Sequence, residues 1–245
     1  MLALPVILFL ILPIVSAVEY YVSPSGTGNL CSQTDPCTLD QARQIVSPGD
    51  VVNMMPGNYG DVVFDENDVL GSPDNWITYR ADSYSVTPRQ SDWYQESLDI
   101  PTPDQHVIFD DFQIRWVRTA DGEFSIPRYW KFEGFNVVGN NVELLYYVSY
   151  VKLKDINVFG QWGDPDKEVV FSTDITHSAF SMRHSYDPSL GSDYSNILIE
   201  NCYAQDVNDL FFIQGNKRGN ITLRGSHVAS TASSCIRLVG GDVND

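Results

Sequence analysis

The chain has 245 residues, 43% of them hydrophobic and 12% aromatic, which is enough apolar material for a core and excludes an intrinsically disordered protein. Its formal net charge is −17, and this excess of acid disfavours nucleic acid and anionic lipid as partners. Among its basic residues only Arg43 precedes Arg80, so a basic strip on an otherwise acidic body stays compatible with the sequence.

Residues 1–17 have the features of a secretory signal. They carry no charge and end in the small-residue pattern Val-Ser-Ala, so we expect cleavage before Val18. An uncleaved anchor is the alternative, but the apolar run is short for a bilayer span and contains Pro5 and Pro13. We therefore expect a secreted or cell-surface protein with no membrane contact, in which residues 18–245 form one domain.

The N-terminal part predicts a strand and turn over Glu19–Gly26, a short helix over Thr38–Val46, a strand over Val51–Met55 and a turn over Pro56–Tyr59. The helix has the position of a cap over the open end of the domain, where an exposed sheet edge would aggregate. Trp76–Arg80 begins the next strand.

The second half of the chain repeats a frame of eight residues: apolar, variable, apolar, charged, turn residue, apolar, polar, apolar. Its copies are spaced 23, 21, 46 and 24 residues apart, and they begin at Val107, Trp130, Val151, Ile197 and Ile221. A repeat of this length that contains strands and no helices indicates a solenoid.

Alternation within the frame places positions one, three, six and eight inside and the others outside. The fifth position holds residue types that tolerate a left-handed backbone, which predicts a corner there: Asp111, Gly134, Asp155, Asn201 and Gly225. Strands this close together leave no room for helical crossovers, so the sequence predicts an all-β fold, a parallel β-helix with a short N-terminal capping helix.

The four cysteines divide into two pairs. Cys31 and Cys37 lie in a loop-like stretch of an exported chain, which favours a local disulfide, whereas zinc is disfavoured because no histidine is near. Cys202 occupies an inward frame position and is predicted to be a buried free thiol rather than half of a bridge to Cys235.

Several segments carry a resemblance to a known family. Tyr20–Gly26, Pro36–Leu39, Pro48–Asp50 and Pro56–Tyr59 resemble the N-terminal segment of secreted right-handed parallel β-helix proteins, the pectate-lyase-like fold. Trp76–Ala81, Val107–Asp110 and Tyr129–Phe135 are similar to polysaccharide lyases of the chondroitinase B and alginate lyase type. The resemblance implies right-handed coils and a carbohydrate-active protein, and it carries over no catalytic residue.

Lyases of this fold remove a proton next to the carboxylate of an acidic sugar, with Lys or Arg as the base and a cation that neutralises the carboxylate. The fourth frame position supplies an outward column of such groups: Asp110, Glu133, Lys154, Glu200 and Arg224. The alternative is an ordinary surface ladder of ion pairs, each of which stabilises the fold little.

A second candidate cluster follows the Ile197 frame. Asp206 and Asp209 could supply oxygen ligands to calcium, the one cofactor that the sequence suggests, but the same residues also suit an ordinary Asp/Asn turn. Under the enzymatic interpretation, Lys217, Arg218 or Arg224 serves as the base or as the clamp on the substrate carboxylate.

Aromatic residues outside the frames suit sugar rings. Trp116 lies beside Arg115 and Arg118, and a flat apolar face next to a cation fits a carboxylated sugar, although these residues could equally pack an insertion onto the body. Together with Glu133 and Lys154 they are the predicted substrate-binding residues.

The sequence thus predicts a secreted carbohydrate-active β-helix protein, with lyase action on an acidic polysaccharide as the first hypothesis. The alternative is a noncatalytic surface or adhesin β-helix that binds glycans or protein partners. No apolar cap follows Val239, so we also expect the solenoid to be truncated at its C-terminus. The sequence does not indicate an oligomeric state.

Overall fold

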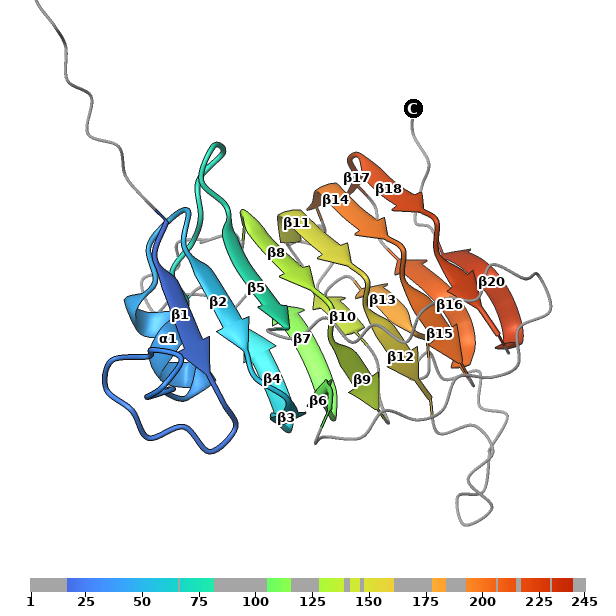
Figure 1. Cartoon of the computed structure of the whole chain (residues 1–245). Helices are drawn as coiled ribbons and strands as arrows, with labels where there is room; N and C mark the ends of the chain where they lie inside the picture. The colour runs from blue at the N-terminus through green and yellow to red at the C-terminus, as the bar shows by residue number, and fades with distance from the viewer. Residues whose placement is uncertain are drawn as a thin grey trace, which may run out of the picture.

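The computed structural model describes residues 17–65, 67–81, 105–115, 128–138, 142–145, 148–160, 178–183, 193–205, 207–214, 217–229 and 231–239. Their strands form three parallel sheets that wind around one core, as Figure 1 shows from the blue N-terminal end to the red end. The predicted all-β, right-handed parallel β-helix with a short capping helix is confirmed. The predicted signal lies outside the described residues apart from Ala17.

The largest sheet has eight strands in parallel register. They are β1 (Glu19–Val22), β2 (Val51–Met54), β5 (Ile77–Ala81), β8 (Trp130–Glu133), β11 (Val148–Lys154), β14 (Asp193–Glu200), β17 (Lys217–Arg218) and β18 (Ile221–Arg224). Both β17 and β18 pair with β14.

Two six-stranded sheets complete each coil. One contains β3 (Gly57–Asn58), β6 (Val107–Phe109), β9 (Asn136–Val138), β12 (Asn157–Phe159), β15 (Tyr203–Gln205) and β19 (His227–Val228). The other contains β4 (Asp61–Phe64), β7 (Asp111–Arg115), β10 (Val142–Leu145), β13 (Phe180–Arg183), β16 (Val207–Gln214) and β20 (Thr231–Val239). Pro56–Tyr59, predicted as a turn, thus contains a two-residue strand.

Four of the five frames occupy equivalent places, because Trp130, Val151, Ile197 and Ile221 pair with one another in the largest sheet. The alignment of the Val107 frame with them is wrong. Its residues form β6 and β7 in the other two sheets, so Asp110 does not belong to the outward column. The eight-residue pattern led to a wrong alignment because apolar residues alternate in the same way in all three sheets of a coil.

The corner predicted at the fifth position is confirmed in the four correctly placed frames. The backbone is left-handed at Gly134 (φ 76°), Asp155 (φ 53°), Asn201 (φ 53°) and Gly225 (φ 63°). Asp111 is an exception because it lies in β7. A recurring left-handed residue between the same two sheets turns the chain by the same amount in each coil.

The prediction that the seventh frame position faces outward is wrong for Asn136 and Asn157, which are buried. The Asn157 side chain donates to the Asn136 side-chain oxygen at 2.9 Å, and Asn136 donates to the carbonyl of Val107 at 3.2 Å. Buried amides are tolerated here because they satisfy one another along the stack of coils.

Aromatic rings fill the N-terminal half of the core. Phe64 lies 4.8 Å from Phe132 and 4.9 Å from Tyr79 between ring centroids, and Tyr79 stacks on Phe132 at 5.3 Å. The buried Trp130 satisfies its indole N–H by donating to the carbonyl of Val69 at 2.9 Å. Cys202 is a buried free thiol, as predicted, and Cys235 is free and exposed.

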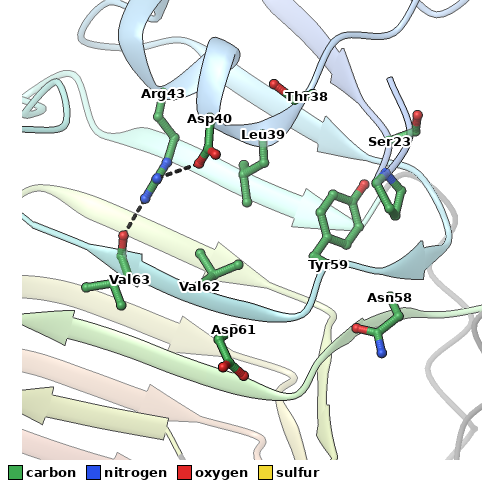
Figure 2. A pocket seen from close by; sticks show the side chains of 11 residues that line it. Ser23, Thr38, Leu39, Asp40, Arg43, Asn58, Tyr59, Asp61, Val62 and Val63 are labelled. Carbon is green, nitrogen blue, oxygen red and sulfur yellow. Dashed lines mark hydrogen bonds and ion pairs between the residues drawn. The ribbon is translucent and has the colours of Figure 1, made fainter. Parts of the chain in front are cut away.

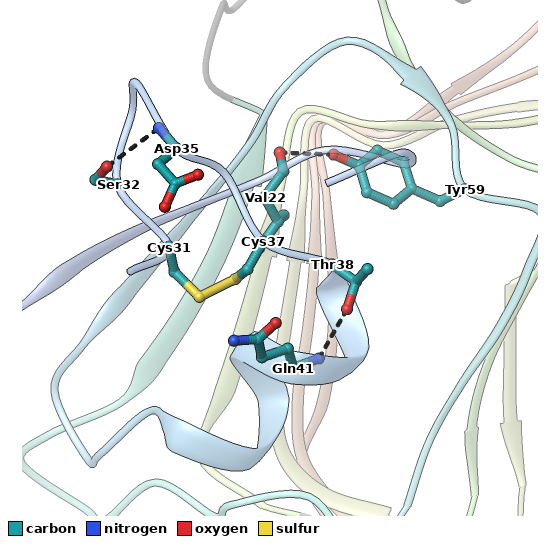
Figure 3. The surroundings of a disulfide bond; sticks show 8 residues. All are labelled: Val22, Cys31, Ser32, Asp35, Cys37, Thr38, Gln41 and Tyr59. Carbon is teal, nitrogen blue, oxygen red and sulfur yellow. Dashed lines mark hydrogen bonds between the residues drawn. A yellow bond between two sulfur atoms is a disulfide. The ribbon is translucent and has the colours of Figure 1, made fainter. Parts of the chain in front are cut away.

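The N-terminal cap consists of α1 (Leu39–Ile45) and a disulfide-closed loop. Thr38 caps the helix by accepting from the backbone N–H of Gln41 at 3.2 Å. The predicted disulfide between Cys31 and Cys37 is present, and Figure 3 shows it beside the helix start. The backbone N–H of Tyr21 donates to the carbonyl of Cys31 at 2.7 Å, which joins the loop to β1.

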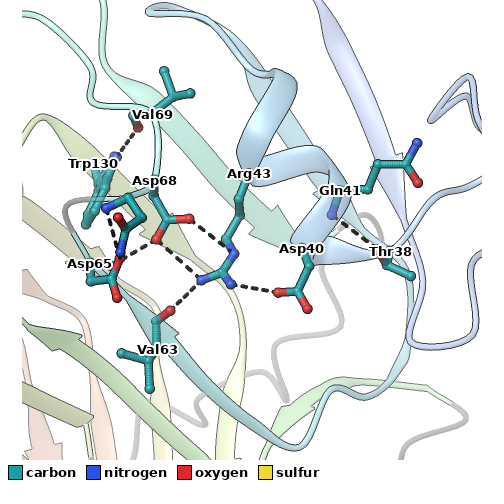
Figure 4. A network of polar contacts seen from close by, with 10 residues as sticks. Thr38, Asp40, Gln41, Arg43, Val63, Asp65, Asp68, Val69 and Trp130 are labelled. Atoms are coloured by element: carbon teal, nitrogen blue, oxygen red, sulfur yellow. Dashed lines mark hydrogen bonds and ion pairs between the residues drawn. The ribbon is translucent and has the colours of Figure 1, made fainter.

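Arg43 joins the cap to the first coil, as Figure 4 shows. Its guanidinium contacts Asp68 (Nε to Oδ1, 3.3 Å) and Asp40 (2.6 Å), donates to the carbonyl of Val63, and lies 5.0 Å from the ring centroid of Phe64. Burial raises the pKa of Asp68 to about 6, because the loss of water outweighs the attraction of Arg43.

The left-handed corner predicts the effect of Gly134→Ala. A Cβ at φ 76° costs roughly 1–2 kcal/mol, so the free energy of unfolding should fall by about that amount. The measurement is chemical denaturation, with the exposed Thr222→Ala as the control. Equal midpoints for Gly134→Ala and the control would contradict a conformational requirement at this corner.

The raised pKa of Asp68 predicts a pH-dependent contribution to stability. The folded protein binds this proton more tightly than the unfolded chain, so the stabilisation is complete below pH 3.8 and is lost as the pH rises through about 6. Asp68→Asn cannot lose a proton, so its stability relative to the native protein should improve between pH 4 and pH 7. A stability difference that stays constant across denaturation curves at pH 4, 5, 6 and 7 would refute this assignment.

Candidate functional site

The outer face of the eight-stranded sheet carries a row of polar and charged side chains, one from each coil. In-register pairing aligns them at the same position of successive strands: Tyr21, Asn53, Arg80, Glu133, Lys154, Glu200 and Arg224. Neighbouring strands lie about 4.8 Å apart, so charges of opposite sign alternate at that spacing from Arg80 to Arg224. These seven side chains form the charged row.

Ion pairs run along the charged row. The ammonium of Lys154 lies 3.7 Å from a carboxylate oxygen of Glu133 and 3.6 Å from one of Asp155. The guanidinium of Arg224 lies 2.6 Å from Glu200. Arg80 donates to the Asn53 side chain at 2.8 Å. Carboxylates between the cations offset the repulsion that a stack of like charges would create.

The row encloses a depression of about 390 Å³, whose lining combines cations, carboxylates and an amide: Tyr21, Asn53, Arg80, Ala81, Glu133, Lys154 and Asp155. Such a surface offers both donors and acceptors to a polar ligand, and it has few apolar groups that would favour a hydrophobic one.

A pair of lysines lies on the same face, two residues before the charged row on β8 and β11. Lys131 and Lys152 are directly opposite each other on β8 and β11. Lys131 contacts Glu133 at 2.6 Å, whereas the ammonium of Lys152 lies 4.0 Å from the ring centroid of Trp76. Within the described part of the chain, no carboxylate lies within ion-pair distance of Lys152.

Three aromatic side chains gather beside these lysines, each one residue before a buried residue of β5, β8 or β11. Tyr129 and Tyr150 stack with ring centroids 4.6 Å apart, and Trp76 meets Tyr129 edge to face at 5.6 Å. The guanidinium of Arg128 lies 5.9 Å from the centroid of Tyr129. All three rings are half-buried, so each keeps some accessible surface.

The structure brings part of the predicted site together. Glu133, Lys154 and Arg224 share the charged row, and Arg80 takes the place that the sequence assigned to Asp110. Lys217 and Arg218 form β17 in the same sheet, where they pair with Asp193 and Tyr194 of β14.

Arg115 lies apart from these residues, at the exposed end of β7 in a six-stranded sheet. On that strand, burial and then the nearby Glu143 raise the pKa of Asp111, while the Gln113 amide donates to it at 2.8 Å. Arg115 therefore does not share a face with Glu133 and Lys154.

Trp116, Arg118 and Asp206 lie outside the described residues. Asp209, the second predicted calcium ligand, is buried on β16 with a carboxylate oxygen 3.4 Å from the Ser178 hydroxyl. Among the described residues, no three His, Cys, Asp or Glu side chains are grouped so that they could hold a metal ion.

Two features of this face were not predicted, the aromatic cluster and the pair Lys131 and Lys152, although each left a signal in the sequence. Lys131 and Lys152 occupy the second, outward position of their frames. Tyr129 and Tyr150 immediately precede a frame, as do Asn196 and Asn220 in the later coils. If the repeat is extended by one residue toward the N-terminus, these two tyrosines occupy equivalent positions in adjacent coils.

A second depression, of about 230 Å³, lies between α1 and the first coil. Figure 2 shows Leu39, Tyr59 and Val62 around it, with Arg43 directed toward Val63 and Asp40. Its charged groups already hold the cap in place, so we assign it to the structure of the cap.

The fold and this face define a parallel β-helix with a polar, cation-bearing sheet surface. No protein-family model matches the chain, and no curated protein matches it. Among solved structures it is similar to one titled rhamnogalacturonan lyase, with a TM-score of 0.55 and 17% identity, over 89% of this chain and 53% of that one.

A second similar structure is the GH136 lacto-N-biosidase from Eubacterium ramulus. Its TM-score is 0.52 at 13% identity, over 86% of this chain and 41% of the other. The chain thus spans about half the length, or less, of the structures it matches. At these identities the likeness shows the fold alone, a β-helix that carbohydrate-active enzymes also use. Within the described residues, no helix has the length and apolar character needed to cross a bilayer.

Proposed function

We propose that this protein is a secreted, carbohydrate-active β-helix protein that binds an acidic glycan along the outer face of its eight-stranded sheet. Polysaccharide lyase action is the reaction class that fits such a substrate. The observation that carries the proposal is the concentration of cations on this face in a chain whose net charge is −17.

At least six of the chain's 15 Lys and Arg residues lie on this face or at its edge: Arg80, Arg128, Lys131, Lys152, Lys154 and Arg224. A local positive surface on an acidic body attracts a polyanion to one place and repels it elsewhere. A glycan with carboxylates is favoured over a nucleic acid because the face is polar and wide rather than uniformly basic, and because half-buried aromatic rings adjoin it.

Export is supported by two features. The charge-free leader predicts secretion, and the disulfide of Cys31 and Cys37 is a bond that persists in oxidising compartments. Extracellular polysaccharides are the acidic glycans that an exported protein would meet.

The ion pairs also favour the rival function, a noncatalytic glycan binder. A lyase needs a base that accepts a proton from the sugar, and the described cations of the charged row already contact carboxylates or an amide. Lys217 and Arg218, which share the sheet, stay candidates for the base.

The binding proposal predicts that the protein retains polygalacturonate or alginate more strongly than neutral dextran. Lys154→Ala should weaken binding by about twofold, which corresponds to about 0.4 kcal/mol, because a sugar carboxylate at Lys154 competes with Glu133 and Asp155. Isothermal titration measures the affinity, and Thr222→Ala, outward on the same sheet, is the matched control. Equal affinity for dextran and for the acidic glycans would refute the proposal.

The lyase hypothesis predicts a rise in ultraviolet absorbance from unsaturated uronate when the protein acts on alginate, pectate or chondroitin with calcium present. Whichever of Lys217 and Arg224 is the base or the carboxylate clamp, its substitution by alanine should lower this rate at least a hundredfold. Measurable glycan binding without any absorbance gain would instead establish the noncatalytic binder.

A further inference from the structure

Lys152 differs from the cations of the charged row. Its ammonium is held over the Trp76 ring, 4.0 Å from the centroid, rather than beside a carboxylate. By contrast, Lys131, its direct neighbour on β8, contacts Glu133 at 2.6 Å, and Lys154, two residues further along β11, contacts two carboxylates. Within the part of the chain that the structure describes, Lys152 therefore combines a fixed position with a charge that no carboxylate compensates.

A chain of contacts fixes that position. The indole N–H of Trp76 donates to the carbonyl of Pro73 at 3.1 Å, and its ring meets Tyr129 edge to face. Tyr129 in turn stacks on Tyr150. A cation over an indole gains about 0.5–1 kcal/mol at an exposed site, enough to favour one arrangement of a flexible side chain without removing its charge.

Like charges oppose each other at this point of the sheet. Lys131 and Lys152 are direct partners on adjacent strands, and such a pair is destabilising. Glu133 offsets the charge of Lys131, whereas the contact found for the Lys152 ammonium within the described residues is the Trp76 ring. An anion bound at Lys152 would relieve the remaining repulsion.

The backbone beside this cluster is strained. Tyr129 (φ 64°) and Tyr150 (φ 53°) have left-handed conformations that bulky residues rarely adopt, at a cost of roughly 1–3 kcal/mol each. In the next coil the equivalent residue is Asn196 (φ 55°), a type that tolerates this conformation well. The chain thus carries aromatic rings at two positions where asparagine would be less strained.

We infer that Lys152, Trp76 and Tyr129 form a subsite for the carboxylate of a uronic acid. The ammonium of Lys152 binds the carboxylate, while the accessible parts of the two rings contact the apolar face of the sugar. This inference rests on the proposed function and names the place on the face where one acidic sugar is recognised. The charged row then contacts the neighbouring part of the glycan.

The test uses hexagalacturonate as the acidic probe and maltohexaose as the neutral one, with the whole chain. Lys152→Ala should weaken hexagalacturonate binding about tenfold and leave the denaturation midpoint within error. Lys131→Ala should weaken it only about twofold, since Glu133 already compensates that lysine. Thr222→Ala serves as the unchanged control. Neither lysine variant should alter the weak binding of maltohexaose.

Tryptophan fluorescence adds a readout that a purely structural lysine would not affect. Binding places a carboxylate beside the ammonium that lies over Trp76, so hexagalacturonate should change the emission of the native protein. Trp76→Phe should lose most of that change while retaining affinity within about threefold, because phenylalanine keeps an aromatic face.

The outcomes separate this subsite from the broader function. Equal losses in Lys152→Ala and Lys131→Ala would overturn the subsite in favour of general electrostatic attraction. Unchanged binding in Lys152→Ala together with a loss in Lys154→Ala would overturn the subsite and leave the proposed function intact. A native protein that binds hexagalacturonate no better than maltohexaose would overturn both.

Discussion

In-register pairing between successive coils is the constraint on which this structure depends. It aligns Tyr79, Phe132, Leu153 and Ile199 inside the largest sheet, and one residue further along it aligns Arg80, Glu133, Lys154 and Glu200 outside. Core and surface are therefore fixed by the same hydrogen bonds. A shift of one residue between two coils would bury the charges and expose the rings, at a cost that no surface interaction could offset.

The fold was predictable because this constraint leaves a periodic trace in the sequence. Trp130, Val151, Ile197 and Ile221 occupy equivalent positions in paired strands, and the left-handed corner after each was visible as Gly, Asp or Asn. The Val107 frame failed for a physical reason: the inside–outside alternation of β6 and β7 matches that of β8, although they belong to other sheets. The alternation of apolar and polar residues indicates whether a side chain faces inward or outward. The sheet to which a strand belongs follows from its pairing with other strands.

The site was predictable to the extent that it follows strand positions. Glu133, Lys154 and Arg224 emerged from the frame, since a charge at a fixed outward position must stack on its equivalents. Trp76, Tyr129 and Tyr150 were missed because each lies one residue before the inward residues by which the strands were aligned. For the two tyrosines, propensity also assigns left-handed positions to Gly or Asn, not to tyrosine. Likewise the buried Asn136 and Asn157 contradict hydrophobic patterning and depend on a partner in the next coil.

The two groups of cations on this face should act differently toward an anion. A ligand carboxylate that approaches Lys154 competes with Glu133 and Asp155, so the gain is offset by the ion pairs that weaken. One that approaches Lys152 displaces no carboxylate of the described residues, leaves the ammonium over the Trp76 ring and offsets the repulsion from Lys131. Affinity should therefore concentrate at the aromatic cluster, while the charged row selects among glycans by where their carboxylates and hydroxyls fall along the coils.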